Sequence, residues 1–351
     1  MQNDYAFLYW HNPFIIKYIY NMIGVIGSGT WATAIVKILL EQQDRKVNWW
    51  VRSEEVRNGI QQNGRNPKYL PDVQLDASRL NLSGDLATVV GDSEYLFLVT
   101  PSAYIASVLE QLPKAAYKGK KFVSAIKGVI PDKRVSVSVY LQNMLKIKRS
   151  NICVISGPTH AEEASHGMPT FLTMASSSPS LAIEVEQMMQ CPYLHTTHTT
   201  EIWFLERVGL LKNIYAICAG ICQGLGYGDN LNAVMVSSAV RELNKLTRSF
   251  GPSTINFFEN CHLGDIMVTC WSHHSRNRRL GEAIAKGKPL QEIFDEMGMV
   301  AEGYYSAKNF HELGLMTGKT DEMPIAEAVY RILYEDADPK TEIDYLIDNV
   351  F

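Results

Sequence analysis

The sequence predicts two domains: an α/β domain built on a parallel-type sheet, and a mostly α-helical domain after it. The chain has 351 residues, which is more than a single hydrophobic core usually serves. Short apolar segments alternate with helical patterns up to about residue 200, as β-α-β units do, and helical periodicity dominates afterwards. We therefore expect an N-terminal extension at residues 1–21 and domains at residues 22–200 and 201–351.

The first 21 residues are apolar, but Asp4, His11, Pro13 and Lys17 interrupt them. A membrane span needs about 20 mostly apolar residues, and a signal peptide ends in a small-residue cleavage site, which this segment lacks. We therefore expect an extension and no membrane insertion. A start codon assigned too far upstream, with Met22 as the true first residue, is an alternative explanation.

The net charge and the cysteine pattern limit which ligands and metal sites we expect. A formal net charge of -4 and a pI near 6.2 give no general attraction for nucleic acid. The six cysteines are scattered without a C-x-x-C pair, which favours reduced thiols in a cytoplasmic protein. Cys218 and Cys222 lie one helical turn apart, but core packing accounts for them, and the histidine spacings match no zinc motif. We expect no metal.

Residues 22–42, MIGVIGSGTWATAIVKILLEQ, predict a strand, a tight turn and a helix. The strand is Ile23–Ile26, and the turn has the spacing Gly27-x-Gly29-x-x-Ala32. The first glycine permits the turn, the second lets a pyrophosphate approach the backbone, and the third position needs a small residue for helix–strand packing. Because the helix N-terminus can also receive a phosphate, the segment predicts a Rossmann-like dinucleotide site.

The second strand, Lys46–Val51, predicts which dinucleotide is bound. An acidic residue after this strand would bind the ribose of NAD, whereas an arginine suits the 2′-phosphate of NADP. Arg52 follows the strand directly, and Glu54 and Glu55 come late and suit a helix start. NADP(H) is therefore favoured, and NAD(H) remains possible. Further strands at 94–100 and 121–128, with a helix at 104–112 between them, extend the sheet.

The helical half contains two polar segments that suggest chemistry. Lys212 interrupts an apolar helical run that starts near Trp203, and spacing alone favours a surface position over a desolvated one in a site. The segment TCWSHHSRNRR, residues 269–279, gathers three arginines and two histidines in an acidic chain. Such a local cluster indicates one small anion more readily than a nucleic acid.

Taken together, the motifs resemble bacterial-type NAD(P)-dependent sn-glycerol-3-phosphate dehydrogenase. The similar segments, in the family's order and spacing from Met22 to about Glu342, are GVIGSGTWATA, SAIKG, SGPTHAEE, LLKNIYAICAG, GLGYGDN, GDIMVTCWSHHSRNRRLG and VAEGYYSAK. The resemblance implies hydride transfer between sn-glycerol 3-phosphate and dihydroxyacetone phosphate, supplying glycerol 3-phosphate for phospholipid synthesis, in a cytoplasmic homodimer. Ala32, where the family has glycine, and a less basic helix at 235–243 depart from the pattern.

The resemblance also implies residue roles. Lys212 would accept the proton, with Lys127 and Asp265 as its catalytic partners. Cofactor contacts would come from Gly27, Gly29, Thr30, Trp31, Arg52, Lys127, Ala161, Arg276, Val300 and Glu302. Substrate contacts would come from Lys127, Gly157, Thr159, Lys212, Asn213, Asp265, Ser275, Arg276 and Asn277, the serine, arginine and second asparagine holding the phosphate. This implication contradicts the surface position that spacing favours for Lys212.

Physical chemistry agrees with these roles. Hydride transfer at the substrate's C2 requires a proton to move at the same carbon's oxygen, which a positioned lysine can accept or give. Two adjacent lysines disfavour each other's charge, which helps one serve as a base, while Asp265 offsets the repulsion. The alternatives are a 3-hydroxyacid dehydrogenase of the 6-phosphogluconate type, which would need a carboxylate site, and a non-catalytic NADP-binding sensor.

Overall fold

The structure is a computed structural model that describes residues 22–249 and 256–351, and the expected extension at residues 1–21 lies outside them. The chain forms two compact units. The first consists of the chain up to Ile126, Ser138–Ile155 and His160–Thr200. The second consists of Lys127–Val137, Ser156–Thr159 and Glu201–Phe351, so two short segments that precede residue 200 pack with the helical part.

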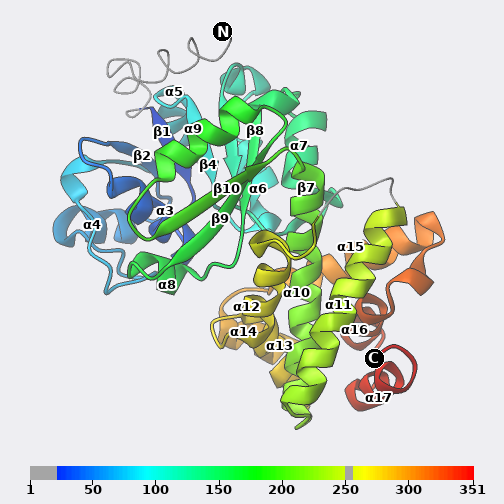
Figure 1. Ribbon diagram of the computed structural model, residues 1–351. Coiled ribbons are helices and arrows are strands. Elements are labelled where there is room, and N and C mark those ends of the chain that lie inside the picture. Colours follow the sequence, from blue (N-terminus) through cyan, green and yellow to red (C-terminus); the bar gives the residue numbers. More distant parts are fainter. Residues whose placement is uncertain (1–21, 250–255) are drawn as a thin grey trace. The chain divides into compact units, whose positions relative to one another are not determined.

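An eight-stranded sheet forms the centre of the first unit (Figure 1). Its order is β10-β9-β8-β5-β4-β1-β2-β3, and the pairs β1–β2, β1–β4, β2–β3, β4–β5, β5–β8 and β9–β10 are parallel. The predicted parallel-type sheet is thus confirmed. The strands are β1 (Ile23–Ile26), β2 (Val47–Trp50), β3 (Leu80–Ser83), β4 (Tyr95–Leu98), β5 (Lys121–Ser124), β8 (Ile152–Ser156), β9 (Thr170–Ser176) and β10 (Leu194–Thr199).

Helices connect these strands in the β-α-β manner that the sequence predicts. They are α3 (Thr30–Leu40), α4 (Glu54–Asn63), α5 (Leu86–Gly91), α6 (Ser102–Leu109), α7 (Val137–Asn143), α8 (Ala161–Ser165) and α9 (Pro179–Met189), with 3₁₀ turns η1 (Ala77–Arg79), η2 (Lys114–Tyr117) and η3 (Arg149–Asn151). The strand expected at 121–128 ends at Ser124, so Lys127 lies in the loop that follows β5.

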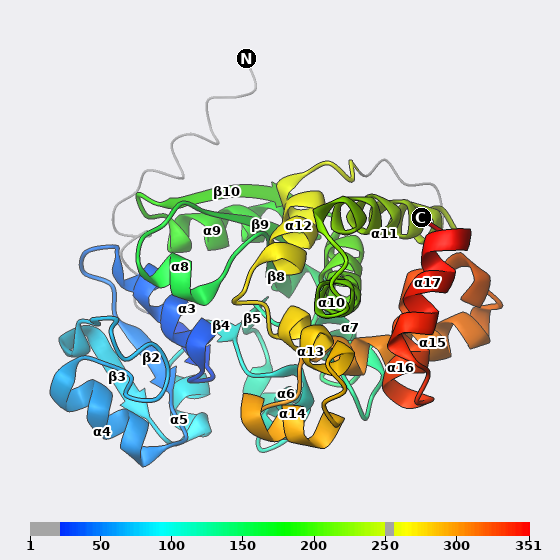
Figure 2. The ribbon, with the colours of Figure 1, turned by 90° about the horizontal axis from the view of Figure 1, so that it is seen from below.

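The second unit is helical apart from a two-stranded antiparallel sheet of β6 (Val129–Ile130) and β7 (Val135–Ser136), which confirms the predicted class. Figure 2 shows its helices from a second direction. They are α10 (Ile202–Gly224), α11 (Asp229–Ser249), the π-helical turn η4 (Asn260–Gly264), α12 (Asp265–Trp271), α13 (Arg276–Ala285), α14 (Leu290–Met297), α15 (Glu302–Thr317), η5 (Thr320–Glu322), α16 (Pro324–Tyr334) and α17 (Pro339–Asn349).

Helix α10 is the core of this unit, because α11, α12, α13, α15 and α16 all pack against it. Nearly all of its 23 residues are buried, as expected of a helix that is apolar on every side. Two glycines allow α10 and α13 to approach backbone to backbone. A Cβ at Gly220 would lie 2.0 Å from the Arg278 carbonyl oxygen, and one at Gly281 would lie 2.1 Å from that of Ile217. This crossing places polar side chains of α10 and α13 in contact.

Candidate active site

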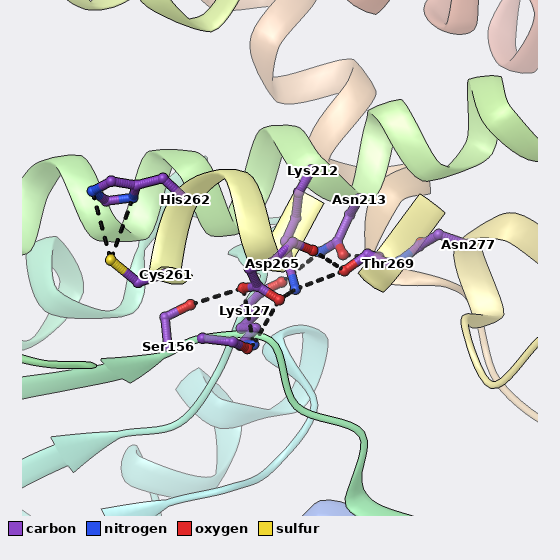
Figure 3. A network of polar contacts seen from close by, with 10 residues as sticks. Lys127, Ser156, Lys212, Asn213, Cys261, His262, Asp265, Thr269 and Asn277 are labelled. Atoms are coloured by element: carbon purple, nitrogen blue, oxygen red, sulfur yellow. Dashed lines mark hydrogen bonds and ion pairs between the residues drawn. The ribbon is translucent and has the colours of Figure 1, made fainter. Parts of the chain in front are cut away.

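Two lysines and one aspartate form a buried charged cluster in the second unit (Figure 3). Lys212 Nζ lies 2.5 Å from Asp265 Oδ1, and Lys127 Nζ lies 3.1 Å from Asp265 Oδ2. Lys212 is 4% exposed and Asp265 is 0% exposed. The surface position that spacing favoured for Lys212 is therefore wrong. Since α10 is buried all round, a lysine on it has no solvent-facing side to occupy.

Helix α12 supplies two groups to the cluster. Asp265 is its first residue and follows the π-helical turn η4 directly. Thr269 lies one turn later, and its hydroxyl donates to the Asp265 carbonyl oxygen at 2.6 Å. Because that bond uses the only hydroxyl proton, Thr269 Oγ1 accepts from Lys212 Nζ, at 3.0 Å. Lys212 therefore donates to two fixed acceptors, the threonine hydroxyl and the Asp265 carboxylate.

The segment Ser156–Gly157 holds the other side of the cluster. The Gly157 carbonyl oxygen accepts a hydrogen bond from Lys127 Nζ at 2.7 Å. The Ser156 hydroxyl donates to Asp265 Oδ2 at 3.2 Å. Sequence reasoning selected neither Ser156 nor Thr269. The signal for Thr269 was its position four residues after Asp265 on one helix, where side chains share a face; for Ser156 it was the carboxyl end of a buried strand.

Burial and charge together set the protonation of these groups. Burial lowers the pKa of Lys212 to about 7, the attraction of Asp265 offsetting part of the effect and the repulsion of Lys127 adding to it. Burial alone would raise the pKa of Asp265, but the Lys127 and Lys212 ammonium groups outweigh it, so the pKa lies below its usual value. The cluster thus pairs a stable carboxylate with a lysine that gains and loses its proton near neutral pH.

A chain of amide hydrogen bonds links three segments next to this cluster. Asn213 Nδ2 donates to the Lys127 carbonyl oxygen at 2.8 Å, and Asn277 Nδ2 donates to Asn213 Oδ1 at 3.0 Å. The Gly303 backbone amide donates to Asn277 Oδ1 at 2.8 Å. Asn213 and Asn277, both expected to contact substrate, therefore also fix the backbone at Lys127 and at the start of α15.

The arginine-rich segment forms the start of α13. Ser275 is the N-cap, and its hydroxyl accepts from the Arg278 backbone amide at 3.3 Å. The Arg276 side chain is exposed, whereas Arg278 is buried and forms an ion pair with Glu282 at 3.0 Å. The charge of Arg278 is thus already paired inside the second unit, and Arg278 has a structural role. The ten-residue α13 has amides at its first turn that its own carbonyl groups do not satisfy, next to the exposed Arg276 guanidinium, which contacts Met299 Sδ.

In the first unit, the glycine turn fits a dinucleotide phosphate. Gly27 has a φ of 128°, and a Cβ there would lie 2.5 Å from the Val99 carbonyl oxygen, so only glycine suits the turn. A Cβ at Gly29 would meet nothing within 4 Å, which leaves open space in front of the α3 N-terminus. Thr30 and Trp31 open α3, and helical bonding begins with Thr33 N donating to Gly29 O at 2.9 Å. The first amides of α3 can therefore receive a phosphate.

Other predicted site residues lie at element ends. Arg52 is exposed and lies two residues beyond the end of β2, Ala161 begins α8, and Thr159 lies two residues before Ala161. Glu302 begins α15, and Val300 lies in the loop before it. The cofactor and substrate contacts expected of these residues, and of the other site residues named from the sequence, remain predictions.

Across residues 22–249 and 256–351, no His, Cys, Asp or Glu group of three or more is arranged to hold a metal ion. The helices in the same ranges include none with the length and apolar character needed to cross a membrane. None of the six cysteines, which all lie in these ranges, forms a disulfide, and Cys218 and Cys222 are buried in the core of the second unit, as core packing predicts.

A parallel sheet with a phosphate-binding glycine turn, joined to a helical unit with a buried lysine–aspartate cluster, defines a dehydrogenase that uses a nicotinamide cofactor. Two family models identify which one. The N-terminal model of NAD-dependent glycerol-3-phosphate dehydrogenase matches residues 22–191, and the C-terminal model matches residues 202–344. The chain belongs to this family.

Individual relatives agree with the family assignment. Glycerol-3-phosphate dehydrogenase (NAD(P)+) 1 of Salinibacter ruber is 33% identical over 326 residues, which is 93% of this chain and 94% of the relative. The enzyme of the same name from Solidesulfovibrio magneticus is 34% identical over 322 residues, or 92% and 96% of the two chains. The crystal structure of glycerol-3-phosphate dehydrogenase from Coxiella burnetii is 26% identical, has a TM-score of 0.86, and covers 94% of this chain and 100% of its own.

Proposed function

We propose that this protein interconverts sn-glycerol 3-phosphate and dihydroxyacetone phosphate with a nicotinamide cofactor, and that it supplies glycerol 3-phosphate for phospholipid synthesis. The observation that carries the proposal is the buried Lys212–Asp265 pair with Lys127 on its other side. Family membership supports the substrate pair. A dehydrogenase for this pair needs a proton acceptor beside C2 and a site for one phosphate, and both sets of residues lie in the second unit.

Lys212 is the proton acceptor in the direction of glycerol 3-phosphate oxidation. A neutral lysine has two N–H bonds and one lone pair. Asp265 Oδ1 and Thr269 Oγ1 take the two N–H bonds, so the lone pair is directed away from both and towards the substrate hydroxyl. The hydroxyl proton passes to Lys212 Nζ as C2 loses its hydride, and in the reverse direction the Lys212 ammonium returns it. The nicotinamide ring, when bound, accepts or gives the hydride.

Lys127 and Asp265 prepare the site for this step. Lys127 Nζ uses two of its three protons on Gly157 O and Asp265, which leaves one for the substrate oxygen on which charge develops. Asp265 keeps two cations close together without net repulsion. Its lowered pKa keeps it ionised throughout the neutral range, so it does not compete for the proton that Lys212 transfers.

Ser275, Arg276 and Asn277 bind the substrate phosphate. An arginine can donate two parallel hydrogen bonds to phosphate oxygens, and the first amides of α13 add further donors. The Arg276 side chain is exposed, and its guanidinium contacts Met299 Sδ, a weak acceptor that phosphate oxygens can replace. Holding the phosphate end orients C2 relative to Lys212, which contributes to rate as well as to affinity.

NADP(H) is the preferred cofactor. Arg52 lies exposed at the end of β2, where the adenosine ribose binds in this fold. The Arg57 guanidinium donates to the carbonyl oxygens of Val51 and Arg52, at 2.6 and 2.9 Å, and adds a second positive charge at the same strand end. Replacing Arg52 by Asp should lower the NADPH to NADH ratio of kcat/KM, and an unchanged ratio would remove this preference.

The family resemblance alone supports a cytoplasmic homodimer, and light scattering of the purified protein tests the assembly. The deciding assay for the function is reduction of dihydroxyacetone phosphate with NADPH and NADH in parallel, with dihydroxyacetone as the unphosphorylated control. We expect turnover of the phosphorylated substrate, and a loss of several orders of magnitude in Lys212→Met with NADPH still bound. Cofactor binding without turnover would favour a non-catalytic sensor.

A further inference from the structure

Ser156 is a buried hydroxyl in the lysine–aspartate cluster with no role assigned above. It is 2% exposed, and its Oγ donates to Asp265 Oδ2 at 3.2 Å (Figure 3). A serine has one hydroxyl proton, so this bond uses its only donor. The next residue, Gly157, accepts the hydrogen bond of Lys127. Two consecutive residues therefore hold both Asp265 and the lysine that binds the same carboxylate oxygen.

The donors around Asp265 divide between its two oxygens. Oδ1 receives Lys212 at 2.5 Å, while Oδ2 receives Lys127 at 3.1 Å and Ser156 at 3.2 Å. Lys127 also lies 3.4 Å from Oδ1, so by itself it does not select one oxygen. The serine hydroxyl contacts Oδ2 alone. It is thus the contact that fixes the rotation of the carboxylate and leaves Oδ1 for Lys212.

We propose that Ser156 is a positioning residue for proton transfer: its hydroxyl fixes the Asp265 carboxylate so that Oδ1 faces Lys212, and it withdraws part of the negative charge that Lys212 experiences. A hydroxyl donor stabilises a carboxylate without adding positive charge. Without the serine hydroxyl, only Lys212 and Lys127 stabilise the negative charge of Asp265. Lys212 then holds its proton more tightly, and the pH needed for glycerol 3-phosphate oxidation rises.

The neighbouring titratable groups do not reverse the expected upward shift in the pKa of Lys212. Besides each other and Lys127, Lys212 and Asp265 interact with two further titratable groups, His262 on η4 and Cys270 on α12. Burial lowers the pKa of His262 to about 4 and raises that of Cys270 to about 12. Both groups are therefore uncharged from about pH 5 to 10, so neither changes its charge while Lys212 titrates.

The test is the pH profile of glycerol 3-phosphate oxidation in Ser156→Ala, with Ser124→Ala as matched control. Ser124 also ends a strand, β5, and is 0% exposed, and its hydroxyl has no hydrogen-bond partner among the described residues. We expect the midpoint of the acid limb to move upward in Ser156→Ala, so that the rate at pH 6 falls about threefold to tenfold more than the rate at pH 9. Ser156→Thr, which keeps the hydroxyl, should restore the parent midpoint, and Ser124→Ala should not move it.

The positioning role of Ser156 rests on the proposed function only because the test measures the rate of glycerol 3-phosphate oxidation. An inactive parent protein would contradict the proposed function. In that case, an NMR titration of Lys212 Nζ, assigned with Lys212→Arg, still measures whether Ser156→Ala raises the pKa of Lys212. An unmoved midpoint in an active Ser156→Ala, or an unmoved Lys212 titration, overturns the role of Ser156. A loss of rate that is equal at all pH values does so too, because it would reflect packing alone.

Discussion

Asp265→Asn tests the electrostatic logic of the site most directly, because it removes one charge and keeps the size of the side chain. The parent cluster has two lysines on one carboxylate, with Nζ–O distances of 2.5 and 3.1 Å. Charges about 4 Å apart attract by about 4 kcal/mol at an effective dielectric constant of about 20. That energy corresponds to about a thousandfold change in a protonation equilibrium.

Without the carboxylate, Lys212 faces Lys127 alone, and its pKa falls well below the parent value of about 7. Reduction of dihydroxyacetone phosphate needs the Lys212 ammonium, so at pH 7 it should fall at least about 100-fold. In the parent protein, oxidation should rise and reduction should fall with increasing pH, both with midpoints near 7.

The assay is the initial rate in both directions from pH 5.5 to 9.5, with cofactor binding followed by NADPH fluorescence. Asp295→Asn, on an exposed side chain of α14, controls for the change in net charge. If Asp265→Asn reduced dihydroxyacetone phosphate within threefold of the parent at pH 7, with the same midpoint, Asp265 would not set the protonation of Lys212.

Three further predictions follow from other contacts. Arg276→Ala should raise KM for dihydroxyacetone phosphate about 10- to 100-fold and leave the weak reaction of dihydroxyacetone unchanged, with the exposed Arg279→Ala as control; an unchanged KM would contradict the phosphate role. Gly281→Ala places a Cβ 2.1 Å from an α10 carbonyl oxygen and should lower the free energy of unfolding by about 1–3 kcal/mol or more. Gly228→Ala, where a Cβ would meet open space, should leave it unchanged. Equal Tm values for the two variants would contradict the close crossing of α10 and α13. Burial raises the pKa of Glu242 to about 8, so the folded protein keeps a proton that the unfolded chain releases above about pH 4.3. The free energy of unfolding therefore declines as the pH rises from about 4.3 to about 8, by up to about 1.4 kcal/mol per pH unit. Glu242→Gln removes that slope, and its Tm should gain on the parent from pH 5 to 8; a constant difference would contradict this.

Local features of the sequence were sufficient to predict the fold of the first unit. Gly27 and Gly29 identified a tight turn with the geometry that a dinucleotide phosphate needs, because positive φ and close backbone approach are requirements of single residues. Alternating strands and helices identified the parallel sheet, because side-chain periodicity is local. Arg52 was placed correctly after β2 for the same reason.

The lysine–aspartate cluster could be recognised only through the family resemblance and the tertiary structure. Lys127 and Asp265 are 138 residues apart, and no periodicity connects them. Spacing placed Lys212 on the surface, but α10 is buried on all sides, so its apolar pattern does not define a face that meets solvent.

The hydrogen-bond partners of Asp265 and Lys212 could be identified only from the folded structure. Ser156 and Thr269 contact the cluster only because a strand end and α12 are brought to the same carboxylate and lysine. The sequence by itself determined the fold class and the glycine turn between β1 and α3, and through resemblance it proposed which residues react. Only the tertiary structure decided their protonation and orientation, because burial and the placement of charges depend on contacts between distant segments.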